Sequence, residues 1–274
     1  MKPVIFTDLD GTLLSAVDYS FEKAVPALER IKKTGIPLVY SSSKTRKEIE
    51  AIRLRTGNAH PFISENGGGI FIPEGYFPFS PGGSRESGYI KITLGRPYSE
   101  VRAALEGVRA VFKSPIKGFG DMTVKEIALE TGLSTSEAAL AMDRDFDEPF
   151  IFEGCPVDEA RLERLIREQG FNSTRGRFHH ILGDHDKGRA FRILKGCYER
   201  LYGVIVTICL GDGANDIPLL KEADYPVLVR KPDGEYEETG LEGVIKSDRA
   251  GPEGWNKAVN RILDEMERAG LMTR

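Results

Sequence analysis

PVIFTDLDGTLLS, residues 3–15, begins with residues that favour a buried strand and runs directly into Asp8 and Asp10. Side chains two positions apart on an extended chain point to the same side, so we expect both carboxylates to face one spot. Like charges held this close repel unless one is protonated or a cation neutralises them. A hard cation such as Mg²⁺ takes oxygen ligands and often pairs carboxylates with a phosphate. The stretch therefore predicts a metal, and with it a phosphate; an ordinary turn before Gly11 is the alternative.

Composition narrows the class of protein. The chain has 274 residues, 40% hydrophobic and 29% charged, which predicts a globular protein with one large or two medium domains. A net charge of -4 gives no reason to expect a nucleic-acid or membrane surface. Cys155, Cys197 and Cys209 are too scattered for a disulfide framework. Without a signal peptide or a long apolar run, the chain is expected to be soluble and cytoplasmic, with its oligomeric state open.

The flanking segments predict an α/β fold of the doubly wound class. Apolar strands alternate with helices: strands at residues 3–6 and 36–41, a strand, turn and strand at 61–73, and helices at 21–35 and 45–57. This alternation predicts a parallel sheet covered on both faces. Ligands of such sheets bind beyond the carboxyl ends of the strands, which is where Asp8 and Asp10 stand.

The middle of the chain has a different texture. From the Gly- and Ser-rich segment near residue 80 onward, short strands with one polar face alternate with short helices, which favours a half-exposed antiparallel sheet. We therefore expect an inserted α+β cap domain at residues 85–184. The core domain is expected to comprise residues 1–84 and 185–274. The first strand of the insertion is expected at YIKITLG, residues 89–95.

A second acidic strand end follows in LGDGANDIPLL, residues 210–220. The strand ends at Gly211, and Asp212, Asn215 and Asp216 come next. Asn and Asp also form turns and helix caps, which is the alternative for Asn215 and Asp216. Two acidic ends in one parallel sheet instead predict a single anionic site.

Basic residues suggest where a phosphate would bind. In YSSSKTRKE, residues 40–48, cations crowd the first turn of a helix, where the helix dipole is already positive. An anion held by Ser42, Lys44 and free backbone amides would remove that conflict; a solvated basic surface is the alternative. Lys187 also precedes a helix, although a single lysine is usually at the surface. His179 and His180 would face opposite sides of a strand and are poor joint zinc ligands.

Taken in order, FTDLDGTLL, the serine-rich strand end, Lys187 and GDGANDIPLL resemble the four motifs of the haloacid dehalogenase superfamily of phosphohydrolases. SSKTRKEIE, ISENGGGIFIP, RDFDEPFIFEG and GRFHHILGDHDKG are similar to segments of the mannosyl-3-phosphoglycerate phosphatase family. The resemblance implies that Asp8 is the nucleophile and Asp10 the proton donor and acceptor. It also implies phosphate-binding and metal-binding groups. The phosphate would be bound by Ser42, Ser43, Lys44 and Lys187, with the serine register open by one, and Mg²⁺ by Asp8, the Asp10 carbonyl oxygen, Asp212 and Asn215 or Asp216.

The same resemblance implies the substrate. A Mg²⁺-dependent phosphatase would convert mannosyl-3-phosphoglycerate, or its glucosyl analogue, to the glycoside, a compatible solute. Arg144 and Arg177 are candidates for the glycerate carboxylate, and Glu65 and Asn66 for sugar hydroxyls. The alternatives are another sugar phosphatase, such as one for sucrose phosphate, a phosphomutase, and a binding protein without catalysis.

Overall fold

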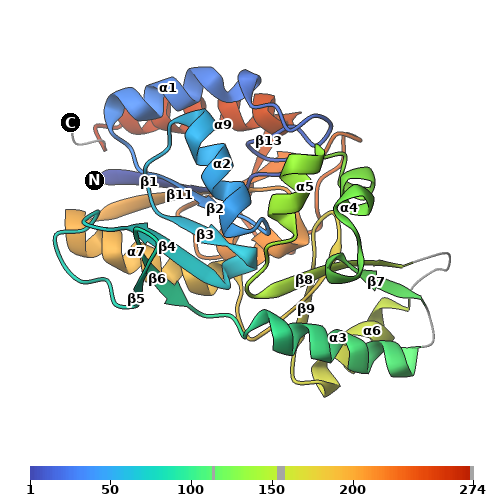
Figure 1. Ribbon diagram of the computed structural model, residues 1–274. Coiled ribbons are helices and arrows are strands. Elements are labelled where there is room, and N and C mark those ends of the chain that lie inside the picture. The colour runs from blue at the N-terminus through green and yellow to red at the C-terminus, as the bar shows by residue number, and fades with distance from the viewer. Residues whose placement is uncertain (113–114, 153–157, 272–274) are drawn as a thin grey trace.

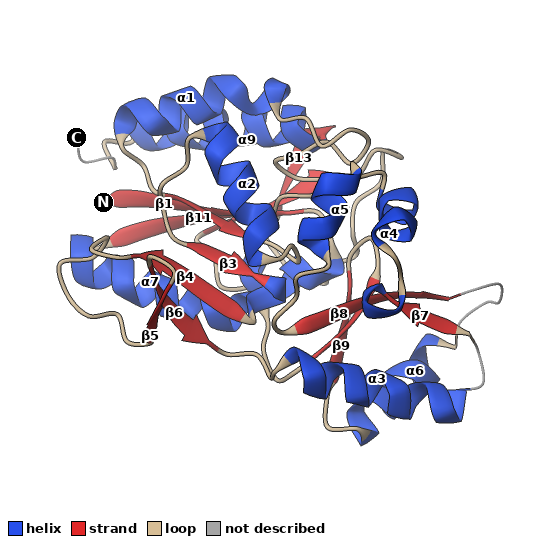
Figure 2. Cartoon of the chain, viewed as in Figure 1, coloured by secondary structure: helices blue, strands red, loops and turns tan. Residues whose placement is uncertain are grey.

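The computed structural model describes residues 1–112, 115–152 and 158–271. A nine-stranded sheet with helices on both faces forms the larger part, and a four-stranded sheet with its own helices lies beside it (Figures 1 and 2). The predicted fold class, a doubly wound core with an inserted α+β unit, is confirmed. No helix among the described residues is long and apolar enough to cross a membrane.

The large sheet is parallel over six strands and antiparallel at one edge. Its spatial order is β13 (Ile245–Ala250), β12 (Tyr225–Arg230), β11 (Ile205–Gly211), β1 (Lys2–Thr7), β2 (Leu38–Ser41), β3 (Phe62–Ser64), β4 (Gly69–Pro73), β6 (Tyr89–Thr93) and β5 (Ser84–Glu86). The central strands β1 and β11 are almost entirely buried, as their continuous apolar runs predict.

Alternation along β1 explains why helices cover both faces. Ile5 belongs to one hydrophobic cluster, whereas Val4 and Phe6 belong to another. The first cluster packs under α1 (Val25–Thr34), α2 (Arg46–Thr56) and α9 (Gly251–Arg268), and the second under α7 (Lys187–Tyr202) and α8 (Ile217–Leu220). The two layers bury the strands and leave their carboxyl ends available for a site.

The smaller sheet is antiparallel, as its pattern predicts. Its order is β7 (Ile116–Gly118), β8 (Asp147–Phe152), β10 (His179–Leu182) and β9 (Asn172–Arg175). On one face α3 (Tyr98–Phe112) and α6 (Glu159–Glu168) pack against Phe150 and Ile181. The helices α4 (Val124–Thr131) and α5 (Thr135–Ala141) form a separate cluster with Phe119 and Phe178.

The strand at residues 89–95, expected to open the inserted domain, lies in the large sheet instead. β6 pairs along its length with β4, and β5 pairs with β6. Ile90 and Ile92 pack against the core cluster that contains Phe6. β6 lies next to the edge strand β5 and is half-exposed like a strand of a separate antiparallel sheet, so pattern alone did not distinguish the two cases. The chain leaves the large sheet after Thr93 and not after residue 84.

Smaller differences concern element ends. The first helix begins at Val25, after a 3₁₀ turn at Glu22–Ala24, rather than at Phe21. Further 3₁₀ turns lie at Glu65–Gly67, Phe119–Asp121 and Ala214–Asp216. β8 ends at Phe152, and residues 153 and 154, with Cys155, lie outside the described residues.

Candidate active site

Three carboxylates meet at the carboxyl ends of β1 and β11. These strands are parallel neighbours, and Asp8 and Asp212 each directly follow one of them. Asp216 ends the 3₁₀ turn after β11. One oxygen of each of the three carboxylates lies within 4.8 Å of the others. The structure thus brings together the two strand-end motifs that the sequence places about 200 residues apart.

Lys187 lies inside this acidic cluster. It is the first residue of α7 and is completely buried. Its Nζ donates to Asp8 Oδ1 at 2.7 Å and to Asp216 Oδ1 at 2.6 Å. Because Lys187 is buried, the sequence-based alternative of a surface lysine is wrong for this residue. A buried ammonium needs anionic partners, and the two carboxylates provide them.

Charge in the cluster is not balanced by Lys187 alone. Burial raises the pKa of Asp8 well above its usual value, and Asp216 and Asp212 add to the rise although Lys187 opposes it. Burial and Asp216 together raise the pKa of Asp212 to about 7. Three clustered carboxylates around one ammonium favour a further cation, and an all-oxygen donor set suits a hard ion. The residues present therefore fit a divalent cation such as Mg²⁺.

Asp10 is paired separately. Its Oδ2 lies 3.0 Å from Lys44 Nζ, and its Oδ1 is buried without a hydrogen-bond partner among the described residues. Gly11 has φ of +78°, and a Cβ there would lie 2.4 Å from Asp212 Oδ2. Asp8 and Asp10 therefore have different lysine partners, Lys187 for Asp8 and Lys44 for Asp10. The carboxylate of Asp10 is not part of the three-residue acidic cluster.

The serine-rich strand end leads into α2. Thr45 caps this helix by accepting from the backbone N–H of Glu48, and the Glu48 side chain accepts from the backbone N–H of Thr45. Ser42 is fully buried, and its Oγ accepts from the backbone N–H of Lys44 at 3.2 Å. Ser43 and Lys44 border the cavity described next. Basic side chains are unfavourable at the positive N-terminal end of a helix dipole. Carboxylates reduce this repulsion for Lys44, which also lies 3.2 Å from Glu48.

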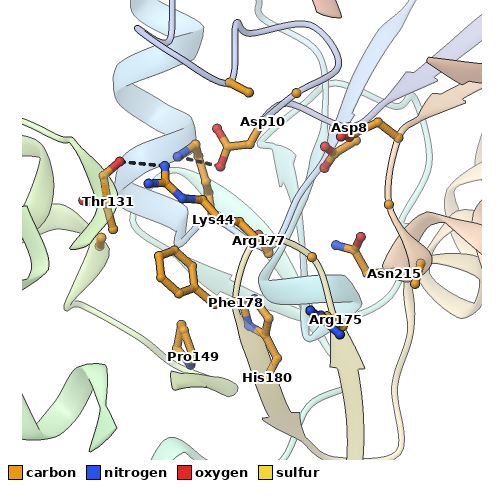
Figure 3. A pocket seen from close by; sticks show the side chains of 18 of the residues that line it. Asp8, Asp10, Lys44, Thr131, Pro149, Arg175, Arg177, Phe178, His180 and Asn215 are labelled. Atoms are coloured by element: carbon orange, nitrogen blue, oxygen red, sulfur yellow. Dashed lines mark hydrogen bonds and ion pairs between the residues drawn. The ribbon is translucent and has the colours of Figure 1, made fainter. Parts of the chain in front are cut away.

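A cavity of about 650 Å³ separates the acidic cluster from the smaller sheet (Figure 3). Asp8, Asp10 and Asp212 border it on the side of the large sheet. Phe178 and His180 border it on the opposite side. The cavity is large enough for a disaccharide-sized ligand, and its two walls come from different sheets.

Two of the residues expected to bind sugar hydroxyls have other partners. The Glu65 carboxylate accepts from the backbone N–H groups of residues 145, 146 and 147 at 2.7–3.1 Å. Asn66 donates to Asp147 Oδ2 at 2.8 Å and accepts from Asn215 Nδ2 at 3.0 Å. Both are buried and connect the two sheets. The predicted contact with sugar hydroxyls is therefore not supported by the structure.

The two arginines differ. The Arg144 side chain is 2% exposed, pairs with Asp147, and donates to the carbonyl oxygens of Asp147 and Ser43. With these partners it connects the sheets and is not free to bind a glycerate carboxylate. Arg177 is exposed at the cavity and donates to Thr131 O at 2.7 Å and to Tyr19 Oη at 3.0 Å (Figure 3).

Sequence reasoning missed two residues of this region. Thr12 donates to Asp212 Oδ1 at 2.8 Å, which holds that carboxylate in place. Asp147 is fully buried between Arg144, Asn66 and His180. The turn at Gly11 could have indicated Thr12, because a turn directs the following residues back towards the strand end. Nothing local in the sequence indicated Asp147.

Three comparisons show what the chain is similar to. Residues 5–77 match the family model described as haloacid dehalogenase-like hydrolase. A glucosyl-3-phosphoglycerate/mannosyl-3-phosphoglycerate phosphatase from Persephonella marina is 50% identical over 97% of this chain and 98% of its own. A relative of the same name from Methanococcoides burtonii is 44% identical over 96% and 98%. The sucrose-phosphatase structure from Synechocystis, with sucrose and phosphate bound, aligns over 100% of both chains with a TM-score of 0.63 at 16% identity.

Proposed function

Because this chain belongs to the haloacid dehalogenase-like hydrolases, in the glucosyl-3-phosphoglycerate/mannosyl-3-phosphoglycerate phosphatase family, we propose that it hydrolyses the phosphate ester of a glycosyl-3-phosphoglycerate. The predicted family and enzyme class, a phosphoric monoester hydrolase, are confirmed by these relatives. The observation that carries the proposal is the Asp8–Lys187–Asp216 contact on one side of a cavity that a second sheet closes.

Asp8 is the proposed nucleophile. Its carboxylate attacks phosphorus, an Asp8–phosphoryl bond forms, and the bond between phosphorus and the glycerate oxygen breaks. Lys187 keeps the Asp8 carboxylate oriented at 2.7 Å and favours its ionised form against the effect of burial. Water then attacks the aspartyl phosphate, releasing inorganic phosphate and restoring the carboxylate.

Asp10 is the proposed acid and base. It protonates the departing glycerate oxygen in the first step and removes a proton from the attacking water in the second. Its Oδ2 is engaged by Lys44, whereas Oδ1 has no partner among the described residues. Oδ1 is therefore the oxygen assigned to carry the proton.

Asp8, the Asp10 carbonyl oxygen, Asp212 and Asn215 or Asp216 would hold Mg²⁺. The ion would offset the negative charge on the reacting phosphoryl group. Thr12 positions Asp212 by a 2.8 Å hydrogen bond. Asn66 positions Asn215 by a 3.0 Å hydrogen bond. Ser42, Ser43, Lys44 and Lys187 are the proposed phosphate-binding residues.

The unit at residues 98–182 is proposed to act as the cap domain. It supplies the cavity wall that faces the acidic cluster, including Arg177 and Phe178. Arg177 is the proposed partner of the glycerate carboxylate, because it is an exposed cation that borders the cavity. The remaining residues form the proposed core domain.

Phosphate release from a panel of phosphorylated compounds tests this function. The panel contains mannosyl- and glucosyl-3-phosphoglycerate, sucrose phosphate and 3-phosphoglycerate, each with Mg²⁺ present or chelated. We expect the highest kcat/KM for a glycosyl-3-phosphoglycerate and loss of turnover on chelation. Preference for sucrose phosphate would contradict the substrate assignment, and turnover only with a bisphosphate activator would indicate a mutase.

A further inference from the structure

The cavity wall contributed by the smaller sheet combines an apolar surface with one polar ring. Phe178 and Pro149 provide the apolar part, and Phe178 is held by an edge-on contact with Phe119, with ring centroids 5.2 Å apart. His180 lies beside them (Figure 3). Ligand pockets combine apolar walls with a few placed polar groups, and a glycosyl ring has matching C–H faces and hydroxyl edges.

Strand geometry directs His180 towards the cavity. His179 and His180 are consecutive in β10, so their side chains point to opposite faces of the sheet. His179 stacks on Phe150 at a centroid distance of 5.6 Å, and Phe150 belongs to the cluster under α3 and α6. His180 is therefore on the face that meets the large sheet, as the adjacent pair predicts.

Asp147 fixes the ring of His180. His180 Nδ1 is buried and lies 3.2 Å from Asp147 Oδ2, a close contact of the ring with the carboxylate that does not have hydrogen-bond geometry. Asp147 is itself paired with Arg144 and accepts from Asn66 at 2.8 Å. Burial raises the pKa of Asp147, but the charge of the neighbouring Arg144 guanidinium opposes burial, and the pKa lies well below its usual range. Asp147 is thus a permanent anion beside Nδ1.

This arrangement determines what Nε2 can do. A carboxylate beside Nδ1 favours the tautomer with the proton on Nδ1, which leaves a lone pair on Nε2. Among the described residues, Nε2 has no hydrogen-bond partner, and the residue borders the cavity. A ligand hydroxyl is the complementary group, because it donates to such a nitrogen.

We propose that His180 Nε2 accepts a hydrogen bond from a hydroxyl of the glycosyl group, whose C–H face packs on Phe178. This inference rests on the proposed function and makes His180 a specificity-determining residue. The residue recognises the sugar, whereas the acidic cluster across the cavity acts on the phosphate. Asp147 is the positioning residue that sets the tautomer of His180.

The test compares three substrates in one set of variants. We would measure kcat/KM for mannosyl-3-phosphoglycerate, glucosyl-3-phosphoglycerate and phenyl phosphate, which has no glycosyl group, with wild type and His180→Phe. We expect the ratio of glycoside to phenyl phosphate kcat/KM to fall by roughly tenfold, the effect of one unmade hydrogen bond to a buried group. His180→Gln, which keeps an acceptor near the position of Nε2, should recover part of the ratio.

His179→Gln is the matched control, because His179 is the neighbouring histidine on the opposite face. It should leave the ratio within about twofold, which is small against the roughly tenfold effect of a lost hydrogen bond. If the ratio also stays within twofold in His180→Phe and His180→Gln, the inference is wrong. If wild type itself shows no preference for either glycoside, the proposed function fails instead. Thermal unfolding of each variant shows whether His180→Phe is folded; if it is not, His180→Leu, which also lacks an acceptor, takes its place, and a ratio within twofold of wild type in that variant overturns the inference.

Discussion

Replacing Lys187 by methionine removes the ammonium that holds the acidic cluster together. Its Nζ lies 2.7 Å from Asp8 Oδ1 and 2.6 Å from Asp216 Oδ1, and the side chain is 0% exposed. Methionine keeps a comparable apolar stem, so the change mainly deletes the charge. Removing one partner of a buried ion pair costs about 3–5 kcal/mol, because the other charge is left uncompensated. We expect Lys187→Met to lower the free energy of unfolding by this amount at neutral pH.

The cost should depend on pH with a definite sign. Loss of the ammonium raises the pKa of Asp8 further above its unfolded value, in the direction that burial already imposes. A carboxyl whose folded pKa is raised binds more protons when folded, so the destabilisation grows as pH rises from the unfolded to the folded pKa. In urea unfolding the difference from wild type should be smallest at acidic pH and should grow as pH rises through the raised pKa of Asp8.

Lys195→Met is the matched control on the same helix. Lys195 Nζ lies 3.9 Å from Glu199, and the two side chains are 30% and 50% exposed. A surface pair contributes about 1 kcal/mol or less, at all pH values where both groups are charged. If Lys187→Met were no more destabilising than Lys195→Met, or if its cost did not rise with pH, the electrostatic account of the cluster would be refuted.

Two further predictions concern the stability of the chain. Gly67 has φ of +100°, and a Cβ there would lie 2.2 Å from Asp186 O, so Gly67→Ala should lower the free energy of unfolding by at least about 2 kcal/mol. Gly88 has φ of +83° but open space around it, so Gly88→Ala should lower it by only about 1 kcal/mol. Thermal unfolding measures both costs, and equal costs would contradict this reasoning. Burial, with Arg53, lowers the pKa of His60 from 6.5 to about 4. The contribution of His60 to the free energy of unfolding is therefore fully present above pH 6.5 and falls by up to about 3 kcal/mol towards pH 4. His60→Gln should reduce this pH dependence of the free energy of unfolding, measured with urea. An unchanged pH dependence would argue against His60 as its source.

The core of the fold could be predicted because its signals are local. β1 and β11 are continuous apolar runs, and only a parallel strand buried on both faces has that pattern beside helices. The end of the core was misplaced because β6 is half-exposed like a strand of a separate antiparallel sheet, and which sheet it joins depends on its pairing with β4. The hydrophobic pattern of a strand does not show which distant strand it pairs with.

The site divides in the same way. Asp8 and Asp212 could be placed because each directly follows a recognisable strand. Lys187 gained weight only from a family resemblance, since its partners Asp8 and Asp216 are distant in sequence. The partners of Glu65 could not be predicted, because they are backbone amides some 80 residues away, which no side-chain pattern reveals.

The central claim is that Asp8 forms a covalent bond to phosphorus, and trapping that bond tests it most directly. Asp10→Asn should slow attack of water on the intermediate, because Asn cannot accept the proton. This variant would be mixed with mannosyl-3-phosphoglycerate and Mg²⁺, quenched in acid and analysed by peptide mass spectrometry. The account predicts one phosphoryl group on Asp8 and none in Asp8→Asn, which should release no phosphate. Normal phosphate release by Asp8→Asn, or a phosphoryl group on another residue, would contradict it.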